Sequence, residues 1–263
     1  MSLTHNPGVR ALILDMDGVL WRDNQAIGDL PWIFAKIKQL NWQVSLATNN
    51  ASRSVAQYLE KLHQFGVDLT PEQIITSGEA TANYLYQRYP NGGNIFVVGE
   101  SGLEKTLADK GFIKSEKDVL AVVSSFDRLL TYDKLKRAAL LIRAGAPLIA
   151  TNADLTFPTP EGLVPGAGAI LAAIVAATQV LPIIIGKPEP EMYRLAIARM
   201  QVPDEATLVV GDRLETDIAG AQKIGSQTAL VLSGVTTLQA AEQWQPSPHW
   251  VTEDLTALLK NFL

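Results

Sequence analysis

The chain has 263 residues, of which 47% are hydrophobic and 19% charged, so it can bury the core of one large domain or two modest ones. A formal net charge of −5 without a basic cluster argues against nucleic-acid binding, and the lack of cysteine excludes disulfides, thiolate metal sites and cysteine nucleophiles. The apolar runs are too short or too interrupted to span a bilayer, and the first residues lack a secretory signal pattern. We therefore expect a cytoplasmic protein with no membrane partner.

The first predicted element is a buried strand over residues 11–14, which runs directly into Asp15, Met16, Asp17 and Gly18. Aspartate is disfavoured inside strands, so we expect Asp15 at the point where this strand ends. In open α/β sheets, ligands bind at the carboxyl ends of the strands. Two carboxylates there favour a bound cation, although the same residues would also suit an ordinary turn.

Apolar runs and helical periodicities then alternate along the chain, which predicts a doubly wound parallel α/β sheet. The further predicted strands cover residues 44–47, 74–75, 95–98, 119–123, 147–150, 183–185, 207–210 and 228–232. The predicted helices cover residues 30–40, 52–65, 79–89, 102–110, 132–144, 165–178, 191–200, 217–224 and 255–262.

A break at residues 90–93, Pro-Asn-Gly-Gly, separates two series of alternating elements. The first sheet needs both ends of the chain to be complete, which predicts that a smaller α/β domain is inserted into a larger one. We expect a discontinuous Rossmann-type core made of residues 1–83 and 183–263, and an inserted domain made of residues 84–182.

Four polar residues occupy comparable positions in this pattern. Asp15, Thr48 and Asp212 each end an apolar strand, and Lys187 closely follows another. Each alone suits a helix cap, a turn or a solvated charge. Together, two carboxylates, a hydroxyl and an ammonium at one sheet edge suit phosphoryl transfer through a carboxyl phosphate, with Mg²⁺ reducing the repulsion between the nucleophile and the phosphate.

The segments that carry these residues resemble a known family. DMDGVLW at 15–21, TNNASRS at 48–54, GKPEPEMY at 186–193 and GDRLETDI at 211–218 are similar in order and spacing to the four motifs of haloacid dehalogenase (HAD) superfamily phosphatases. The insertion resembles the α/β type IIA cap of the NagD-like, 4-nitrophenylphosphatase-type branch. Within it, FDRLLTYDKL at 126–135, TNADLTFPT at 151–159 and GLVPGAGAI at 162–170 carry the likeness.

The resemblance implies a phosphatase that hydrolyses small phosphate monoesters through a phosphoaspartate intermediate. It implies that Asp15 is the nucleophile and Asp17 the general acid and base. Thr48 and Asn49 would bind the substrate phosphate together with Lys187, whose charge would also stabilise the transferring group.

The resemblance also implies a Mg²⁺ cofactor. The carboxylates of Asp15 and Asp212 and the backbone carbonyl of Asp17 would hold the ion. Asp217 would lie behind them and support the water ligands or Lys187.

Features outside the four motifs support weaker expectations. Asn152 and Asp154 are candidates for substrate contacts in the inserted domain, although a turn would explain them as well. Trp21 lies beside the acidic pair and is a candidate to touch the substrate. A homodimer through the cap is implied by the resemblance alone.

Three other functions compete with a phosphatase. A phosphorelay receiver, or another phosphoaspartate signalling or binding protein without turnover, would use a similar aspartate, hydroxyl and lysine, but has neither the second acid at Asp17 nor the large insertion. A catalytically dead scaffold is disfavoured because every motif position holds the expected residue. A true dehalogenase needs neither Mg²⁺ nor an acid at the position of Asp17.

Overall fold

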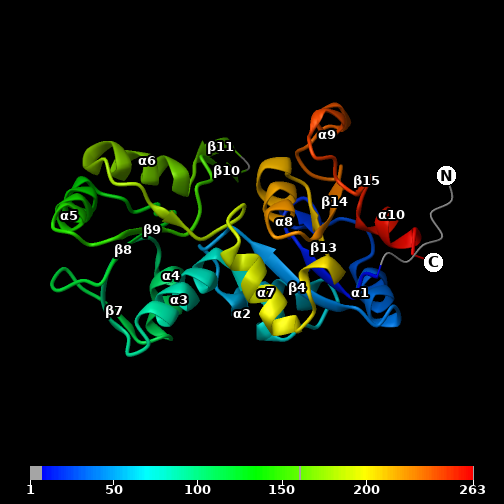
Figure 1. The fold of residues 1–263 in the computed structure, drawn as a ribbon, viewed down its shortest axis with the longest axis horizontal. Helices are drawn as coiled ribbons and strands as arrows, with labels where there is room; N and C mark the ends of the chain where they lie inside the picture. The colour runs from blue at the N-terminus through cyan, green and yellow to red at the C-terminus, as the bar shows by residue number, and fades with distance from the viewer. Residues whose placement is uncertain (1–7, 160, 263) are drawn as a thin grey trace. The chain divides into compact units, whose positions relative to one another are not determined.

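The computed structural model describes residues 8–159 and 161–262, and they form two compact units (Figure 1). The first unit comprises the chain up to Thr48, then Val55–Ile75, and the chain from Lys187 onward. The second unit comprises Asn49–Ser54 and Thr76–Gly186. Both units are discontinuous in sequence.

The first unit is built on a sheet with the strand order β15-β14-β13-β1-β4-β5. Neighbouring strands from β4 to β15 pair in parallel. The register places Leu14 of the central strand beside Leu46 on one side and Val210 on the other. The strands are β1 (Ala11–Leu14), β4 (Gln43–Thr48), β5 (Ile74–Thr76), β13 (Thr207–Gly211), β14 (Gln227–Val231) and β15 (Trp250–Thr252).

Helices cover both faces of this sheet. They are α1 (Leu30–Gln39), α2 (Val55–Gln64), α7 (Glu191–Met200), α8 (Ala219–Lys223), α9 (Leu238–Gln243) and α10 (Leu255–Lys260). Short 3₁₀ turns occupy Pro71–Gln73 and Asp204–Ala206, and a π-helical turn, Leu214–Ile218, leads into α8. A small hairpin of β2 (Trp21–Arg22) and β3 (Gln25–Ala26) follows the central strand.

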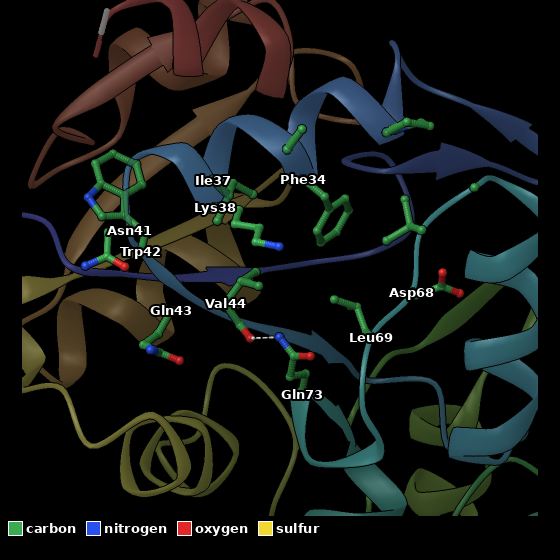
Figure 2. A pocket seen from close by; sticks show the side chains of 14 residues that line it. Phe34, Ile37, Lys38, Asn41, Trp42, Gln43, Val44, Asp68, Leu69 and Gln73 are labelled. Carbon is green, nitrogen blue, oxygen red and sulfur yellow. Dashed lines mark hydrogen bonds between the residues drawn. The ribbon is translucent and has the colours of Figure 1, made fainter.

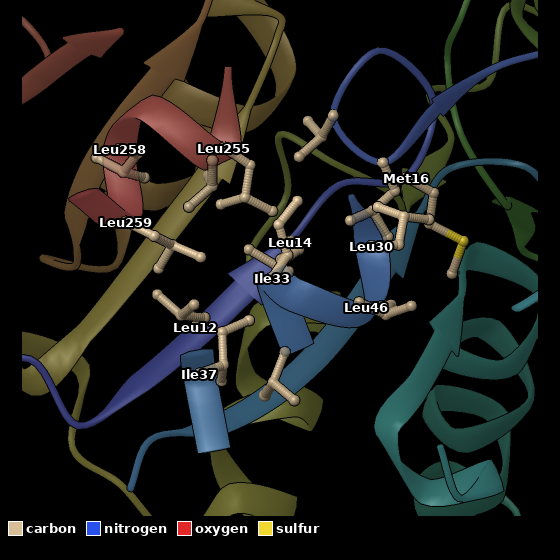
Figure 3. Close-up of a cluster of buried hydrophobic side chains, with 14 of the residues drawn as sticks. Leu12, Leu14, Met16, Leu30, Ile33, Ile37, Leu46, Leu255, Leu258 and Leu259 are labelled. Atoms are coloured by element: carbon tan, nitrogen blue, oxygen red, sulfur yellow. The ribbon is translucent and has the colours of Figure 1, made fainter. Parts of the chain in front are cut away.

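The side chains of β1 alternate between the two faces, as the period of a strand requires. Leu12 and Leu14 belong to the cluster that α1 and α10 complete, which Figure 3 shows from close by. Ala11 instead packs with Val202 and Ala206 near the end of α7. Burial on both faces explains why the strand is continuously apolar up to Asp15, where it ends.

The second unit has its own parallel sheet, with the order β12-β9-β8-β6-β7. Its strands are β6 (Gly93–Val98), β7 (Phe112–Lys114), β8 (Val122–Ser124), β9 (Leu148–Ala150) and β12 (Ile183–Ile184), and a separate hairpin joins β10 (Thr156–Thr159) to β11 (Gly162–Pro165). Its helices are α3 (Ser77–Arg88), α4 (Ser101–Ala108), α5 (Tyr132–Arg143) and α6 (Ala167–Thr178). The helices α5 and α6 pack with β6, β8 and β9 around a separate core.

The predicted fold class is confirmed: the chain has a doubly wound parallel α/β core with an inserted smaller α/β unit. The second unit extends beyond residues 84–182, because α3 packs on α4 and β12 pairs with β9. The helix predicted over residues 217–224 begins earlier, as the π-helical turn. The elements β7, β10, β11, α9 and β15 were not predicted, and each is short. Among residues 8–159 and 161–262, no helix is long and apolar enough to cross a membrane.

Candidate active site

Three of the predicted site residues stand at the ends of neighbouring strands in the first unit. Asp15 follows β1, Thr48 ends β4 and Asp212 follows β13. The parallel register of these strands brings their carboxyl ends to one edge of the sheet. The backbone N–H of Asp15 still donates to the carbonyl of Val210 over 2.9 Å, so the first acid is fixed by the last hydrogen bond of the ladder.

Lys187 connects Asp15, at the end of the central strand, to Asp217 in the last of the four motifs. Its Nζ atom donates to Asp15 Oδ1 over 2.5 Å, to Asp217 Oδ1 over 2.7 Å and to the Ala47 carbonyl over 3.0 Å. The lysine side chain is 4% exposed. An ammonium has three hydrogens, and these three acceptors fix its position.

Asp217 is held by protein groups at both oxygens. Oδ1 accepts from Lys187, and Oδ2 accepts from the backbone N–H of Arg213 over 3.2 Å. A Cβ on Gly211 would lie 2.1 Å from the Cβ of Asp217, so the strand end must be glycine for this carboxylate to fit. The Tyr193 hydroxyl donates to the Thr216 and Asp217 carbonyls, which anchors the π-helical turn that presents the acid.

Asp212 differs because only one of its oxygens has a partner. Oδ2 accepts from the backbone N–H of Val235 over 2.9 Å, whereas Oδ1 is buried and has no hydrogen-bond donor among the described residues. Buried carboxylate oxygens in native proteins are nearly always satisfied by a donor or a cation. Oδ1 is therefore available to a ligand of positive charge.

The donor set fits a hard divalent cation. Asp15, Asp212 and Asp217 each offer one carboxylate oxygen, and these atoms lie within 4.8 Å of one another. Carboxylate oxygens are the ligands that Mg²⁺ prefers. Because Asp217 is already held at both oxygens, Asp15 and the orphaned Oδ1 of Asp212 are the carboxylates best placed for the ion.

The electrostatics of the cluster also favour a cation. Burial raises the pKa of Asp15 well above its usual value; Lys187 opposes this, and the charges of Asp217 and Asp212 add to it. Burial, with the charge of Asp217, raises the pKa of Asp212 to about 6. Burial alone would lower the pKa of Lys187, but the charges of Asp15 and Asp217 outweigh it and raise that pKa well above its usual value. A bound divalent ion would relieve the repulsion among the carboxylates.

Asp17 stands apart from this cluster. Its side chain is exposed, and Oδ1 accepts a hydrogen bond from Trp21 Nε1 over 2.9 Å. Trp21 itself is 1% exposed, so the expectation that it touches the substrate is wrong. The turn between the two residues is closed by the N–H of Gly18, which donates to the Trp21 carbonyl over 2.7 Å.

The other residues predicted to bind the phosphate or the substrate belong partly to the first unit and partly to the second. Thr48 is 3% exposed at the end of β4, and Asn49 begins the first segment of the second unit. Within that unit, the Asn49 carbonyl accepts from Ser77 Oγ over 2.5 Å and from Asn152 Nδ2 over 2.8 Å, and Asn49 Nδ2 donates to both oxygens of Asp154 over 3.2 Å. The structure thus brings Asn152 and Asp154 to Asn49, and their role in substrate contacts stays a prediction.

Sequence reasoning missed the loop that follows β14. The Ser233 hydroxyl donates to the Gly18 carbonyl over 2.7 Å, and the Thr236 hydroxyl donates to the Asp212 carbonyl over 2.5 Å. A Cβ on Gly234 would lie 1.9 Å from Asp212 Oδ2, so the loop approaches the acid as closely as glycine allows. The signal was present in the sequence: Ser233 and Gly234 follow an apolar strand, and polar residues follow the apolar strands of the other motifs in the same way.

A hollow of about 500 Å³ in the same unit lies elsewhere (Figure 2). Its lining includes Phe34, Trp42 and Leu69, together with Gln43 and Val44 at the start of β4. Thr48 is at the opposite end of β4, and the acidic cluster lies at that same edge of the parallel sheet. None of the predicted site residues lines this hollow.

Comparison with known proteins gives the class. Residues 12–113 match the family described as haloacid dehalogenase-like hydrolase, and residues 184–258 match the family described as HAD-hydrolase-like. An acid sugar phosphatase of Staphylococcus aureus (strain USA300) is 33% identical over 247 residues, which cover 94% of this chain and 95% of that protein. The chain therefore belongs to the haloacid dehalogenase-like hydrolases.

Solved structures narrow the class further. A 4-nitrophenylphosphatase from Thermotoga maritima matches with a TM-score of 0.92 and 36% identity, over 97% of both chains. NagD from E. coli K-12 matches with a TM-score of 0.87 and 32% identity, over 94% of this chain and 97% of that one. Within its family the chain is a NagD-like phosphatase, and the resemblance found in the sequence is confirmed.

Proposed function

We propose that this chain is a Mg²⁺-dependent phosphatase that hydrolyses small phosphate monoesters through a phosphoaspartate intermediate on Asp15. The observation that carries the proposal is the joint placement of Asp15, Lys187 and Asp212 at one sheet edge, with a buried Asp212 oxygen that has no donor among the residues the structure describes. The small-ester class is supported by relatives named acid sugar phosphatase and 4-nitrophenylphosphatase.

In the first half of the proposed reaction, an oxygen of Asp15 attacks phosphorus and the bond from phosphorus to the ester oxygen breaks. Lys187 contacts Asp15 and can neutralise charge on the transferring group. Thr48 and Asn49 hold the phosphoryl oxygens. Asp17 gives its proton to the departing alcohol oxygen.

In the second half, Asp17 takes a proton from water while the water oxygen bonds to phosphorus. The bond between phosphorus and Asp15 breaks, which releases inorganic phosphate and regenerates the carboxylate. Asp17 thereby recovers the proton that it lost, so the cycle balances.

Asp15 and Asp212, with the Asp17 backbone carbonyl, would hold Mg²⁺, and Asp217 would keep Lys187 in place. The ion, when bound, supplies positive charge that lets a carboxylate approach a phosphate dianion. Asp212 Oδ1, which accepts from no donor in the described part of the chain, is available to this ion.

We assign the catalytic role to the first unit and a cap role, with substrate selection, to the inserted domain predicted over residues 84–182. Asn152 and Asp154 belong to that domain. A homodimer through it is part of the proposal, and the 84% exposed Leu181 beside the edge strand β12 is an apolar side chain that such an interface could bury. The cytoplasmic location likewise stays a prediction.

Phosphate release from a panel of sugar phosphates and other small esters, with Mg²⁺ and with EDTA, tests the proposal. We expect many turnovers with Mg²⁺, none with EDTA, and none from Asp15→Asn, which keeps the size of the side chain but loses the nucleophile. A protein that took up one phosphoryl group without turnover would instead be a signalling or binding protein. Substantial activity in Asp15→Asn would refute the nucleophile.

A further inference from the structure

The indole of Trp21 is more firmly held than a surface hairpin requires. Its ring stacks on Tyr58 of α2 with centroids 6.5 Å apart, and on Phe65 with centroids 6.0 Å apart. Lys61 Nζ lies 4.1 Å from the centroid of the ring and donates to the Asp23 carbonyl over 2.6 Å. The indole is therefore fixed by α2 and by the hairpin that carries it.

This fixed group has one polar atom, and that atom is directed at Asp17. Trp21 Nε1 donates to Asp17 Oδ1 over 2.9 Å. Asp17 is exposed, and its carboxylate accepts no other hydrogen bond from residues 8–159 and 161–262. An exposed aspartate without such a partner would sample several rotamers.

The chemistry of the indole decides which oxygen of Asp17 can act. An indole N–H is a donor only, so its partner must be an oxygen with a lone pair. Oδ1 is that acceptor in this structure. In a protonated carboxyl the carbonyl oxygen is the stronger acceptor, so this hydrogen bond favours a proton on Oδ2, the oxygen that the indole leaves open.

We infer that Trp21 is a positioning residue, which fixes the carboxylate of Asp17 so that Oδ2 delivers and receives the proton in phosphate-ester hydrolysis. The inference rests on the proposed function, and it assigns a role to a residue outside the acidic cluster. Trp21 does not touch the substrate; it acts through Asp17.

The two half-reactions depend on Asp17 to different degrees, which provides a specific test. 4-Nitrophenolate is a good leaving group and needs little proton donation, whereas attack by water on the phosphoaspartate needs the base with every substrate. Loss of the indole N–H should therefore slow the second half more than the first when 4-nitrophenyl phosphate is the substrate.

The test compares Trp21→Phe with wild type in rapid-mixing experiments with Mg²⁺. The variant keeps an aromatic ring but loses the donor. We expect a burst of nitrophenolate of about one per active site, followed by a steady-state rate about tenfold to hundredfold below wild type, because general acid–base catalysis contributes about 10²–10⁴-fold in rate. With glycerol phosphate, whose alcohol is a poor leaving group, both phases should slow.

Trp42→Phe is the matched control. Trp42 lies in the same unit and is 8% exposed, but it packs on Phe262 and lines the hollow at the starts of the strands. We expect this variant to lose stability without a burst or a change in steady-state rate. If Trp21→Phe does not fold, benzothienylalanine at position 21 decides the matter, because sulfur replaces the N–H in a ring of nearly the same shape.

Equal slowing of the burst and the steady state would assign Trp21 a purely structural role and overturn the inference. An unchanged or higher rate would also overturn it, and a higher rate would show that the hydrogen bond holds Asp17 away from the reacting atoms. Failure of the proposed function looks different: wild type would then release no phosphate from either ester.

Discussion

Lys187 Nζ lies 2.7 Å from Asp217 Oδ1, and the two side chains are only 4% and 2% exposed. A buried ion pair of this kind is costly to break, because the remaining charge keeps its desolvation penalty and loses its partner. The same ammonium contacts Asp15, so in the proposed mechanism both stability and catalysis depend on Lys187 Nζ.

Lys187→Met should therefore cost about 3–5 kcal/mol of unfolding free energy. It should also lower kcat by about 10²–10³-fold, as loss of a charge-stabilising donor does. Urea denaturation and steady-state kinetics measure the two effects. Lys223→Met is the matched control, because it breaks an exposed pair with Glu189 over 2.9 Å and should cost at most about 1 kcal/mol. Equal losses in the two variants would contradict the role of Lys187.

Gly234→Ala tests how closely the loop after β14 must approach Asp212. The new Cβ would lie 1.9 Å from Asp212 Oδ2, so the carboxylate must move and Oδ1 moves with it. We expect Mg²⁺ affinity to fall about 10–100-fold, the range seen when a group that orients a ligand is lost. Titration calorimetry of the folded protein measures the affinity directly.

The control for this variant is Gly225→Ala, in the same unit. Gly225 has a φ of +76° and open space around its Cβ position. Alanine there should cost stability through backbone strain, about 1–3 kcal/mol, and leave Mg²⁺ affinity unchanged. Wild-type Mg²⁺ affinity in Gly234→Ala would show that the contact with Asp212 does not matter.

The raised pKa of Asp212 predicts how Mg²⁺ binding depends on pH. Burial and Asp217 raise that pKa to about 6 in the metal-free protein, so below pH 6 the ion must displace a proton. Loss of the Asp212 charge alone should lower the affinity by up to about tenfold per pH unit as pH falls below 6. Asp15, whose pKa is also raised by burial, should add to this dependence.

The raised pKa of Asp212 also affects the stability of the metal-free protein, which is measured in EDTA. The folded state binds the Asp212 proton more tightly than the unfolded state, whose pKa is near the usual 3.8. This group therefore favours folding most below pH 4, and its contribution is lost as pH rises from about 4 to about 6. Asp212→Asn should make both profiles less steep, with the contribution of Asp15 remaining, and calorimetry with thermal unfolding across pH 4–8 checks them. A variant with wild-type pH dependence would assign the titration to another group.

Much of the site could be predicted because strand-end chemistry is visible in sequence. The apolar runs before Asp15, Thr48 and Asp212 identify the strands, and the parallel sheet brings their ends together. The roles of these residues came from the family motifs and still await experiment. For these residues the structure adds the hydrogen-bond partners and the distances to them.

Other features depend on contacts that no local pattern encodes. Trp21 stood beside the acids in sequence, but its burial follows from packing on Tyr58 of α2 and on Phe65, which follows that helix. Strands such as β7 and β15 have only three residues each, too few to show a period. The loop at Ser233 is far from Asp212 in sequence, and only the order of the strands makes them neighbours.

Asp154 could orient Asn49 or contact the leaving group directly, and substitution of Asp154 distinguishes these two roles. Its carboxylate accepts from Asn49 Nδ2, which predicts that it orients Asn49 and so affects phosphate binding. Loss of a hydrogen bond to a charged group costs about 1.5–3 kcal/mol, so Asp154→Ala should weaken phosphate binding by about tenfold or more. Because the phosphate is common to every substrate, KM for all esters and the inhibition constant of inorganic phosphate should rise together, with kcat nearly unchanged. Direct contact with the leaving group would instead give an effect that varies among esters and spares inorganic phosphate. Asp133→Ala, at an acid that is 83% exposed in the same unit, should change neither constant.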